Sequence, residues 1–505
     1  MKKNKLLFVL PVVTLLSVTS CAQTSLDLLK NAPDYSQSTG QFLTFAYASP
    51  TNGIYRIDGE DYYTGENYQT VERYREYKAA GLNTMMIQWE DRYPQNNETE
   101  FAGSHAEQLM NLCVEAGIER CIITDNRIRD LSSKNYPIVG SGCLYETQAE
   151  LNAFVASCIN DYHDHPVFYG LLLHDEPFWQ YLDAYGAVYR AIKAYDPNIY
   201  IESNLNPYST EESAKERYSP DYASMTSAEA YEDYLRRYLA ATGAEKVLMD
   251  VYPFIFISNN EKIRDGYFKG IQMIANFCHE NGLIFEAVGQ AFGGNINGIR
   301  RWSMPSMPMM QWQMNTFMAM GVQKFGFYTY WRKVANSTTG EWFNDGESFI
   351  TSDGRKTSVY YTAQTLIEEM QNFAPTILNF EYQAFRTIAN EPVAYPIDYG
   401  NMDEMEFALL DDEDITITEG RMCAINELYD EANDRYMYMM MNAMDPRLKS
   451  SEKDLVMDYS LDFGSKYNAV MVYYRGQAKL EPLNKGVYTS SLDAGYAEYL
   501  IPYKA

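Results

Sequence analysis

Two adjacent carboxylates close an apolar run in the tetrapeptide His174-Asp175-Glu176-Pro177. The preceding segment, 167–173, is apolar and contains one glycine, a pattern that indicates a fully buried strand. Burying ionised carboxylates without partners is costly. The pair at this strand end therefore favours chemistry over packing, because a carboxyl group can donate a proton to a leaving group or accept one from water.

Eight apolar runs alternate with helix-like segments between about Gln41 and Gln371. The runs are 42–49, 82–89, 120–124, 167–174, 199–204, 246–252, 283–290 and 324–331. The helix-like segments are 68–80, 106–116, 148–162, 181–195, 227–242, 267–281 and 309–320, followed by a last helix over 358–373. This alternation predicts a parallel sheet with right-handed crossovers, and eight units match an α/β fold, the closed (β/α)8 TIM barrel. A doubly wound sheet would need a glycine-rich phosphate loop, which the sequence lacks.

From about Thr376 short alternating runs appear, separated by turn residues. They are 381–388, 414–418, 435–442, 455–463, 469–474 and 497–502. This pattern predicts a C-terminal all-β sandwich domain. The expected organisation is a leader over 1–20, a tether over 21–40, the barrel over 41–375 and the sandwich over 376–505. The aromatic residues of the sandwich alternate as core residues do, which favours bracing of the barrel over carbohydrate binding.

The N-terminus resembles a bacterial lipoprotein signal peptide. Three lysines within the first five residues precede an apolar segment over 6–18 that is too short to span a bilayer as a mature helix. Val18-Thr19-Ser20-Cys21 resembles a lipobox, which implies that Cys21 becomes the lipidated first residue. We therefore expect the protein to be attached to the bacterial cell envelope. The expected membrane is the outer membrane, with the protein facing either the periplasm or the cell surface. The alternative is an ordinary secretory signal with a chance cysteine.

The charge balance favours a neutral partner. Formal net charge is -27, and loss of the three leader lysines brings it to -30, so the surface repels nucleic acid. The 44 tyrosines and six tryptophans suit sugar rings, although core filling accounts for most of the tyrosines.

Cysteines and histidines give no metal pattern. The six cysteines after Cys21 show no CxxC pair and no finger spacing. Cys113, Cys121, Cys158 and Cys278 are expected to be buried thiols, and one disulfide of undetermined pairing stays possible. The five histidines are scattered. We therefore expect neither a metal nor a cofactor.

In a barrel, side chains at the C-terminal strand ends line one pocket. Here these ends are rich in carboxylates, amides and aromatics, without a Ser-His-Asp arrangement, an activated cysteine or a phosphate loop. The residues expected to contact substrate are Trp89, Glu90, Asp125, His174, Asp175, Asn204, Tyr252, Gln290 and Trp331. Each also has a structural alternative as a cap, an ion pair or a core group. Paired carboxyls with aromatic floors are what cleavage of a glycosidic bond needs.

The Glu176-Pro177 step resembles the barrel glycoside hydrolases of the large retaining clan, β-galactosidase-like. In that clan strand four ends in Asn-Glu-Pro, with glutamate as acid/base, and strand seven carries a glutamate nucleophile. The resemblance implies Glu176 as general acid. Asp175 replaces the asparagine, so the match is partial. The segments 311–331 and 353–360 also resemble the last barrel unit of β-galactosidase-like lipoproteins of gut bacteria.

The second carboxylate is not settled by the pattern. Strand seven ends in Gln290, which cannot be a nucleophile, and Glu286 falls mid-strand with the same side-chain parity. Glu286 can serve if the strand begins later, whereas Asp250 ends strand six and is preferred. The expected function is hydrolysis of O-glycosidic bonds in a neutral oligo- or polysaccharide. The alternatives are a non-catalytic glycan-binding barrel lipoprotein and a structural surface protein.

Overall fold

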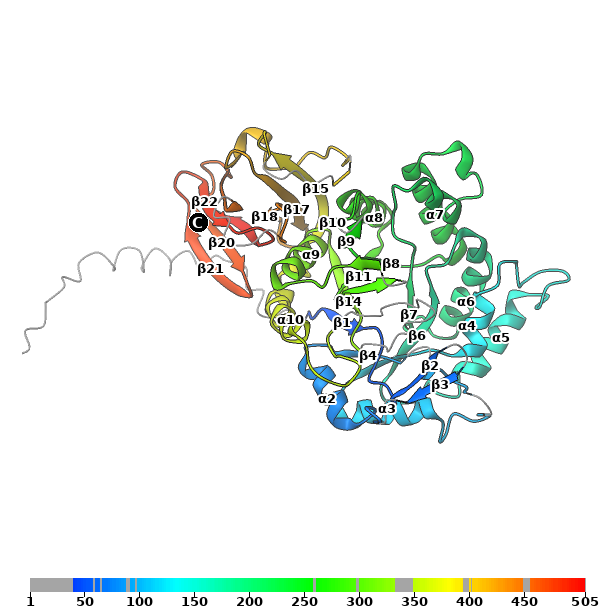
Figure 1. Ribbon diagram of the computed structural model, residues 1–505. Helices are drawn as coiled ribbons and strands as arrows, with labels where there is room; N and C mark the ends of the chain where they lie inside the picture. Colours follow the sequence, from blue (N-terminus) through cyan, green and yellow to red (C-terminus); the bar gives the residue numbers. More distant parts are fainter. Residues whose placement is uncertain are drawn as a thin grey trace, which may run out of the picture.

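The computed structural model describes residues 40–504 apart from gaps at 58–59, 64–65, 88–90, 96–97, 258–259, 297–298, 332–347, 394–398, 401 and 448–454. Its central sheet has eight parallel strands (Figure 1). They are β1 (Leu43–Ala46), β4 (Thr84–Met86), β5 (Arg120–Ile123), β6 (Phe168–Asp175), β7 (Tyr200–Asn204), β8 (Lys246–Val251), β11 (Ile284–Gln290) and β14 (Val322–Tyr328). The eight predicted strands are confirmed.

The sheet closes on itself. Its strands follow the order β7-β6-β5-β4-β1-β14-β11-β8. A parallel bridge then joins Leu205, just after β7, to Met249 of β8, and the Leu205 amide donates to the Leu248 carbonyl at 2.8 Å. The result is the expected (β/α)8 barrel, in which the C-terminal strand ends surround one mouth.

Helices surround the barrel (Figure 1). They are α2 (Val71–Ala79), α3 (His105–Ala116), α4 (Asn126–Ser132), α5 (Gln148–Ile159), α6 (Leu182–Tyr195), α7 (Ser227–Thr242), α8 (Tyr267–Asn281), α9 (Met307–Ala319) and α10 (Ser358–Ile377). Short 3-10 turns lie at η3 (Trp179–Tyr181), η4 (Glu212–Arg217), η5 (Tyr222–Ser224) and η6 (Asp412–Asp414). The short α4 was not predicted. Helix α10 runs through Pro375, past its expected end at Phe373, and gives up one backbone hydrogen bond there because proline has no amide hydrogen.

Local sequence explains where these helices begin and end. Thr226 caps α7 in a reciprocal capping box with Glu229, and Gly243 ends the helix with a left-handed φ of 62°. Ser104 and Gly117 do the same for α3, without the reciprocal glutamate bond. Each cap stabilises a helix at the point where its backbone groups lose their partners.

Antiparallel hairpins extend the loops at the mouth, and the sequence analysis did not predict them. One hairpin pairs β2 (Ile54–Ile57) with β3 (Glu60–Tyr63). After β8 comes the hairpin β9 (Phe254–Ile257) and β10 (Asn260–Ile263), and after β11 comes β12 (Gly294–Ile296) and β13 (Ile299–Trp302). The last two hairpins join into one sheet, because Ile255 of β9 pairs with Trp302 of β13.

The C-terminal part is a β-sandwich of two unequal antiparallel sheets. The larger has the order β15-β17-β18-β23-β20-β21 and the smaller β16-β19-β22. The strands are β15 (Glu381–Ala389), β16 (Ile415–Ile417), β17 (Met422–Asp430), β18 (Arg435–Asn442), β19 (Met457–Asp462), β20 (Ala469–Tyr474), β21 (Gln477–Pro482), β22 (Val487–Leu492) and β23 (Ala497–Tyr503). The predicted fold class is confirmed, although β17, β21 and β22 were missed.

The larger sheet packs on the barrel with one face. Along β18, Met437, Met439 and Met441 join the core shared with the barrel, whereas Tyr438 and Met440 join the core between the two sheets. This alternation is the two-residue period of a strand. In Figure 1 the C-terminal strands lie beside α8, α9 and α10. Such packing is what a bracing domain requires.

The cysteines form no disulfide in the described part of the chain. Cys113, Cys121, Cys158 and Cys278 are buried thiols, as expected, and Cys143 and Cys423 are also free. The leader, the tether and Cys21 lie outside the described residues. Among the helices that the structure describes, none is both long and apolar enough to cross a bilayer.

Candidate active site

Two carboxyl groups meet at the mouth of the barrel. Glu176 directly follows β6 and Asp250 lies near the end of β8. Each of these carboxyl groups lies close enough to the other to change its pKa. Two carboxylates this close repel each other, which favours the state in which the pair carries one proton. The structure thus brings together two residues that lie 74 positions apart, each at a C-terminal strand end.

Burial and like charge raise the pKa of both carboxyls. Asp250 is 4% exposed, and burial, followed by the charges of Glu176 and Asp175, raises its pKa well above the usual range. Burial also raises the pKa of Glu176, with a further contribution from Asp175. The nearby charges of Arg217 and Arg264 oppose that rise in the pKa of Glu176. Asp250 therefore holds the shared proton more firmly.

The backbone at Glu176 has an uncommon conformation. Its φ is 47°, in the left-handed region that few non-glycine residues occupy. The Glu176 amide donates to the Asn204 carbonyl at 2.9 Å, and the Glu176 carbonyl accepts from Asn206 Nδ2 at 3.0 Å. Strained backbone of this kind clusters at functional sites, where the surrounding structure holds it in place. Here the segment after β7 fixes the turn from which Glu176 reaches Asp250.

Asp175 and His174 lie beside the carboxyl pair. Asp175 is accessible at the mouth, Asn204 Nδ2 donates to its Oδ1 at 3.3 Å, and the surrounding protein raises its pKa. His174 is half-buried, and its Nδ1 donates to the Asp175 carbonyl at 3.0 Å. Burial lowers the pKa of His174 to about 4, so its ring is neutral at neutral pH. Asp175 thus acts on the pair as a charge, and Asn204 orients it.

A further carboxyl, Glu202 of β7, is fully buried inside the barrel. The Tyr47 hydroxyl donates to its Oε1, and its Oε2 has no hydrogen-bond partner among the described residues. Burial raises the pKa of Glu202 to about 8. The charges of Asp175 and Asp250 both act on Tyr47, so this bonded pair borders the mouth. At neutral pH Glu202 is largely protonated, so it adds little charge to the mouth.

Aromatic rings continue from the pair along one side of the mouth. Burial and the charge of Asp250 raise the pKa of Tyr252, whose ring lies 5.1 Å from that of Phe292 and 5.8 Å from that of Tyr328. Tyr328 is in turn 5.8 Å from Tyr47. Tyr47 and Phe292 are buried, but Tyr252 and Tyr328 are partly exposed. These two rings lie beside acidic groups, which suits a ligand with both apolar C–H faces and hydroxyl rims.

Glu286 lies at the opposite end of the barrel. It is fully buried and accepts contacts from Lys246 Nζ at 2.6 Å, Lys324 Nζ at 2.8 Å and the Tyr200 hydroxyl at 2.7 Å. Lys246 and Tyr200 are the first residues of their strands, whereas the mouth is at the last. The two ammonium groups lower the pKa of Glu286. This setting favours a structural ion cluster over the catalytic alternative that the sequence left open.

Gln290, at the end of β11, is fully buried and bound to backbone. Its Oε1 accepts from the Phe254 amide at 2.9 Å. Its Nε2 contacts three carbonyl oxygens, those of Phe254 at 3.1 Å, Phe292 at 3.1 Å and Ser303 at 2.8 Å. The side chain therefore fastens the bases of the two mouth hairpins together, which favours a structural role over the predicted substrate contact.

Other predicted contact residues also have protein partners. Asp125 is buried, forms a bidentate pair with Arg127 and caps α4. Trp331 is 1% exposed, with the Tyr68 ring 4.7 Å away and Arg73 over its face. These environments favour structural roles. Trp89 and Glu90 lie outside the described residues.

Two cations near Glu176 were missed by the sequence analysis. Arg217 belongs to η4 and Arg264 follows β10, and neither is at a barrel strand end. In the sequence, the only sign of these two cations was the length of the loops after β7 and β8. The described residues contain no cluster of three or more metal-ligating side chains.

Comparisons with known proteins do not assign the chain to a family. No family model and no curated protein matches it. A solved glycoside hydrolase family 5 structure from Bacteroides vulgatus shares 11% identity and a TM-score of 0.47, covering 92% of this chain and 89% of that one. An endo-β-1,4-mannanase from Thermotoga petrophila shares 11% identity and a TM-score of 0.39, covering 90% and 92%. A β-galactosidase from Marinomonas ef1 shares 9% identity and a TM-score of 0.39, covering 66% and 60%.

The ion cluster at the barrel floor predicts a stability effect of Glu286→Gln. Removing the carboxylate leaves two buried ammonium groups unpaired, so we expect a loss of about 3–5 kcal/mol in urea unfolding at neutral pH. Because the folded pKa of Glu286 lies below its unfolded value, its stabilisation is complete above the unfolded pKa and is lost as pH falls through the folded pKa. The gap between wild type and variant should therefore shrink in acid. Exposed Glu280→Gln on α8 is the matched control; equal stability of Glu286→Gln and wild type contradicts the prediction.

The clamp formed by Gln290 predicts that Gln290→Glu does not create a strand-seven nucleophile. A carboxylate there would face the carbonyls of Phe292 and Ser303 in place of the amide donor, so we expect a destabilisation on the order of 1–3 kcal/mol. Thermal unfolding and glycoside hydrolysis measure the two outcomes. A gain in hydrolysis without loss of stability would instead make strand seven the site of the second carboxylate.

Proposed function

We propose that this protein is a glycoside hydrolase that cleaves O-glycosidic bonds of a neutral oligo- or polysaccharide. The observation that carries the proposal is that Glu176 and Asp250 lie together at the barrel mouth, at the ends of β6 and β8, where each changes the pKa of the other. One proton shared by two carboxyls supplies both an acid for the leaving oxygen and a carboxylate for the anomeric carbon or its water. The mouth aromatics support a sugar as the ligand.

The resting pair assigns a role to each carboxyl in this proposal. Asp250 holds the proton, because it is the more deeply buried and lies beside two other carboxyls. Arg217 and Arg264 favour the ionised form of Glu176. Asp250 is then the proton donor and Glu176 the carboxylate, the reverse of the role that the sequence resemblance implied for Glu176.

The contact between the carboxyls also bears on stereochemistry. Inverting enzymes hold their carboxyls about 6.5–9.5 Å apart to admit a water, whereas retaining enzymes hold them about 5–5.5 Å apart. Because Glu176 and Asp250 lie close enough to change each other's pKa, we favour the shorter, retaining separation.

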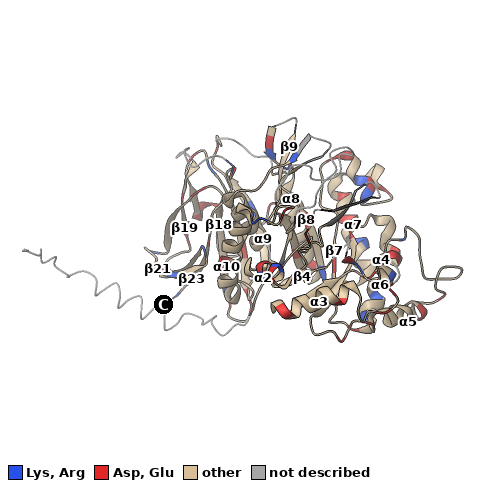
Figure 2. Cartoon of the chain, turned by 60° about the horizontal axis from the view of Figure 1, so that its bottom comes forward, with Lys and Arg blue, Asp and Glu red and all other residues tan. Residues whose placement is uncertain are grey.

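A neutral substrate follows from charge. The chain carries a formal net charge of -27, and three carboxyl groups lie at the mouth. Figure 2 shows acidic and basic residues mixed over the helices around the barrel, and among the coloured residues no face of that view is given over to Lys and Arg. An anionic sugar would therefore meet repulsion at close range.

Lipid anchoring at Cys21 belongs to the proposal as well. The support is the sequence resemblance of Val18-Thr19-Ser20-Cys21 to a lipobox after an apolar leader. The proposed location is the bacterial cell envelope, with the catalytic barrel tethered to a membrane. Metabolic labelling with a fatty-acid probe tests it, since Cys21→Ser should lose the label.

The carboxyl pair predicts a large and specific loss of hydrolysis. Glu176→Gln and Asp250→Asn should each lower the rate of reducing-sugar release from the polysaccharide cleaved best among soluble galactan, xylan and mannan by about 10²- to 10⁴-fold. Asp183→Asn, an exposed acid at the start of α6, is the matched control and should leave the rate unchanged. Azide should rescue Glu176→Gly, in which the truncated side chain leaves space for the anion, whereas a substrate with an activated leaving group should rescue Asp250→Asn. The opposite pattern restores the sequence-based role of Glu176.

Full hydrolysis by both pair variants contradicts the catalytic assignment. Binding of a polysaccharide by wild type without any product after long incubation favours the non-catalytic glycan-binding barrel instead. The position of Gln290, where a retaining barrel carries its nucleophile, is the observation behind that second candidate.

The charge of Asp175 predicts a shift in the pH profile. Asp175 raises the pKa of both Glu176 and Asp250, so Asp175→Asn should lower both. The donor acts only when protonated, and its pKa sets the alkaline limb of the profile. That limb should move to lower pH in Asp175→Asn and stay in place in Asp183→Asn. An unmoved or raised limb would show that Asp175 does not act on the pair.

A further inference from the structure

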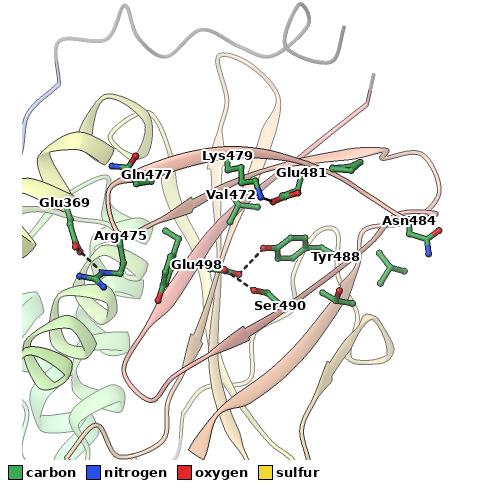
Figure 3. Close-up of a pocket in the computed structure, with 14 residues that line it drawn as sticks. Glu369, Val472, Arg475, Gln477, Lys479, Glu481, Asn484, Tyr488, Ser490 and Glu498 are labelled. Carbon is green, nitrogen blue, oxygen red and sulfur yellow. Dashed lines mark hydrogen bonds and ion pairs between the residues drawn. The ribbon is translucent and has the colours of Figure 1, made fainter. Parts of the chain in front are cut away.

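The two sheets of the sandwich differ in width, and this difference leaves a groove. The larger sheet ends in β20 and β21, whereas the smaller sheet ends in β22. Between these edges and α10 lies a cavity of about 830 Å³. Figure 3 shows side chains from β20, β21 and β22 around it, with Glu369 of α10 at one end. A cavity of this volume can hold several linked units of a small oligomer.

The wall next to the barrel is tightly packed. Arg475 and Gly476 form the two-residue turn between β20 and β21, with φ values of 48° and 70°. Positive φ at both positions is the geometry of the tight hairpin turn. A Cβ on Gly476 would lie 2.9 Å from the Glu369 Cα, so the turn rests directly on α10. The groove is thus built in part by the junction with the barrel.

Two of the three carboxylates that line the groove are paired with cations. Arg475 Nε lies 3.2 Å from Glu369 Oε1, and Lys479 pairs with Glu481. Glu498 is buried, and hydroxyls from Tyr459, Tyr488 and Ser490 donate to its carboxylate, the last at 3.0 Å. Figure 3 shows Tyr488 and Ser490 directed toward Glu498. Glu498 adds a negative charge without a cationic partner among the lining residues, so the groove disfavours an anionic ligand.

What the groove offers is uncharged hydrogen bonding and an aromatic face. Because Tyr488 and Ser490 donate to Glu498, their oxygens are left as acceptors for a ligand hydroxyl. Tyr474, at the end of β20, is 37% exposed and lines the groove. Acceptors beside an exposed ring match a polyhydroxylated ring whose hydroxyls donate and whose C–H face is apolar.

We propose that this groove is a second carbohydrate-binding site, which takes a neutral oligosaccharide or a stretch of a neutral polysaccharide. It is separate from the barrel mouth, shares no residue with it, and holds no acid–carboxylate pair, so it binds without cleaving. The sandwich then has two functions, because its other face packs on the barrel while the uncovered part of this face holds glycan. The inference does not depend on hydrolysis by the barrel.

Affinity electrophoresis of the full chain tests the site in gels that contain soluble galactan, xylan or mannan, with polygalacturonate as the charged comparison. Asp250→Asn serves as the background, so that no polymer is cleaved during the run. We expect retardation by at least one neutral polymer. Adding Tyr474→Ala or Ser490→Ala should weaken the apparent affinity about tenfold, the effect of one lost ring or hydrogen-bond contact.

Matched variants separate the groove from general damage. Ser491→Ala changes the next residue of β22, whose hydroxyl contacts Asp458 outside the groove, and Tyr361→Ala removes an exposed tyrosine of α10 that does not line it. Both should migrate like the background. Equal retardation of Tyr474→Ala and its background, no retardation by any neutral polymer, or stronger retardation by polygalacturonate overturns the proposal. Loss of hydrolysis alone, with retardation intact, contradicts only the proposed function of the barrel.

Discussion

The constraint on which this structure depends is that no carboxylate can stand unpaired in the interior of the barrel. The protein meets that constraint differently at each depth. At the floor, Glu286 keeps its charge because two lysines surround it. Higher up, Glu202 is largely neutral and bonded to Tyr47. At the mouth, Asp250 shares a proton with Glu176. Pairing thus gives way to protonation toward the open end, and only there does a proton become available to a ligand.

The two faces of the larger sandwich sheet have different surroundings, and one of them binds the barrel. Methionines at every second position of β18 fill the junction, and their flexible thioethers suit an irregular surface between a sheet and helices. The opposite face of that sheet is only partly covered, because three strands cannot span six. One domain therefore provides both a rigid support and an open concave surface. The two uses follow from sheet widths, not from separate modules.

The sequence predicted the features that depend on the local pattern of residues and missed those that depend on closure of the barrel. Apolar strands such as 167–173 stand out because burial of a strand within the barrel leaves few positions for polar side chains. β17 was missed because Asn426 and Glu427 look like loop residues, yet both are buried and bind backbone, at Met439 and Ala408. Glu176 and Asp250 were each placed at strand ends, but their contact depends on the closed ring. The burial of Trp331 depends on Tyr68, more than 260 positions away, which no local pattern contains.

The clamp at Gln290 has a consequence for how such a protein can diverge. One amide fixes the bases of two loops that are encoded some forty residues apart, so the loops share a mechanical anchor. Their tips can lengthen, shorten or change composition without moving the strands beneath, while their bases must keep three carbonyl positions. Sequence changes that alter ligand preference are therefore expected at the loop tips, where they leave the acidic centre unchanged. At the position where a retaining barrel carries its nucleophile, this protein has an amide side chain that anchors the surrounding loops.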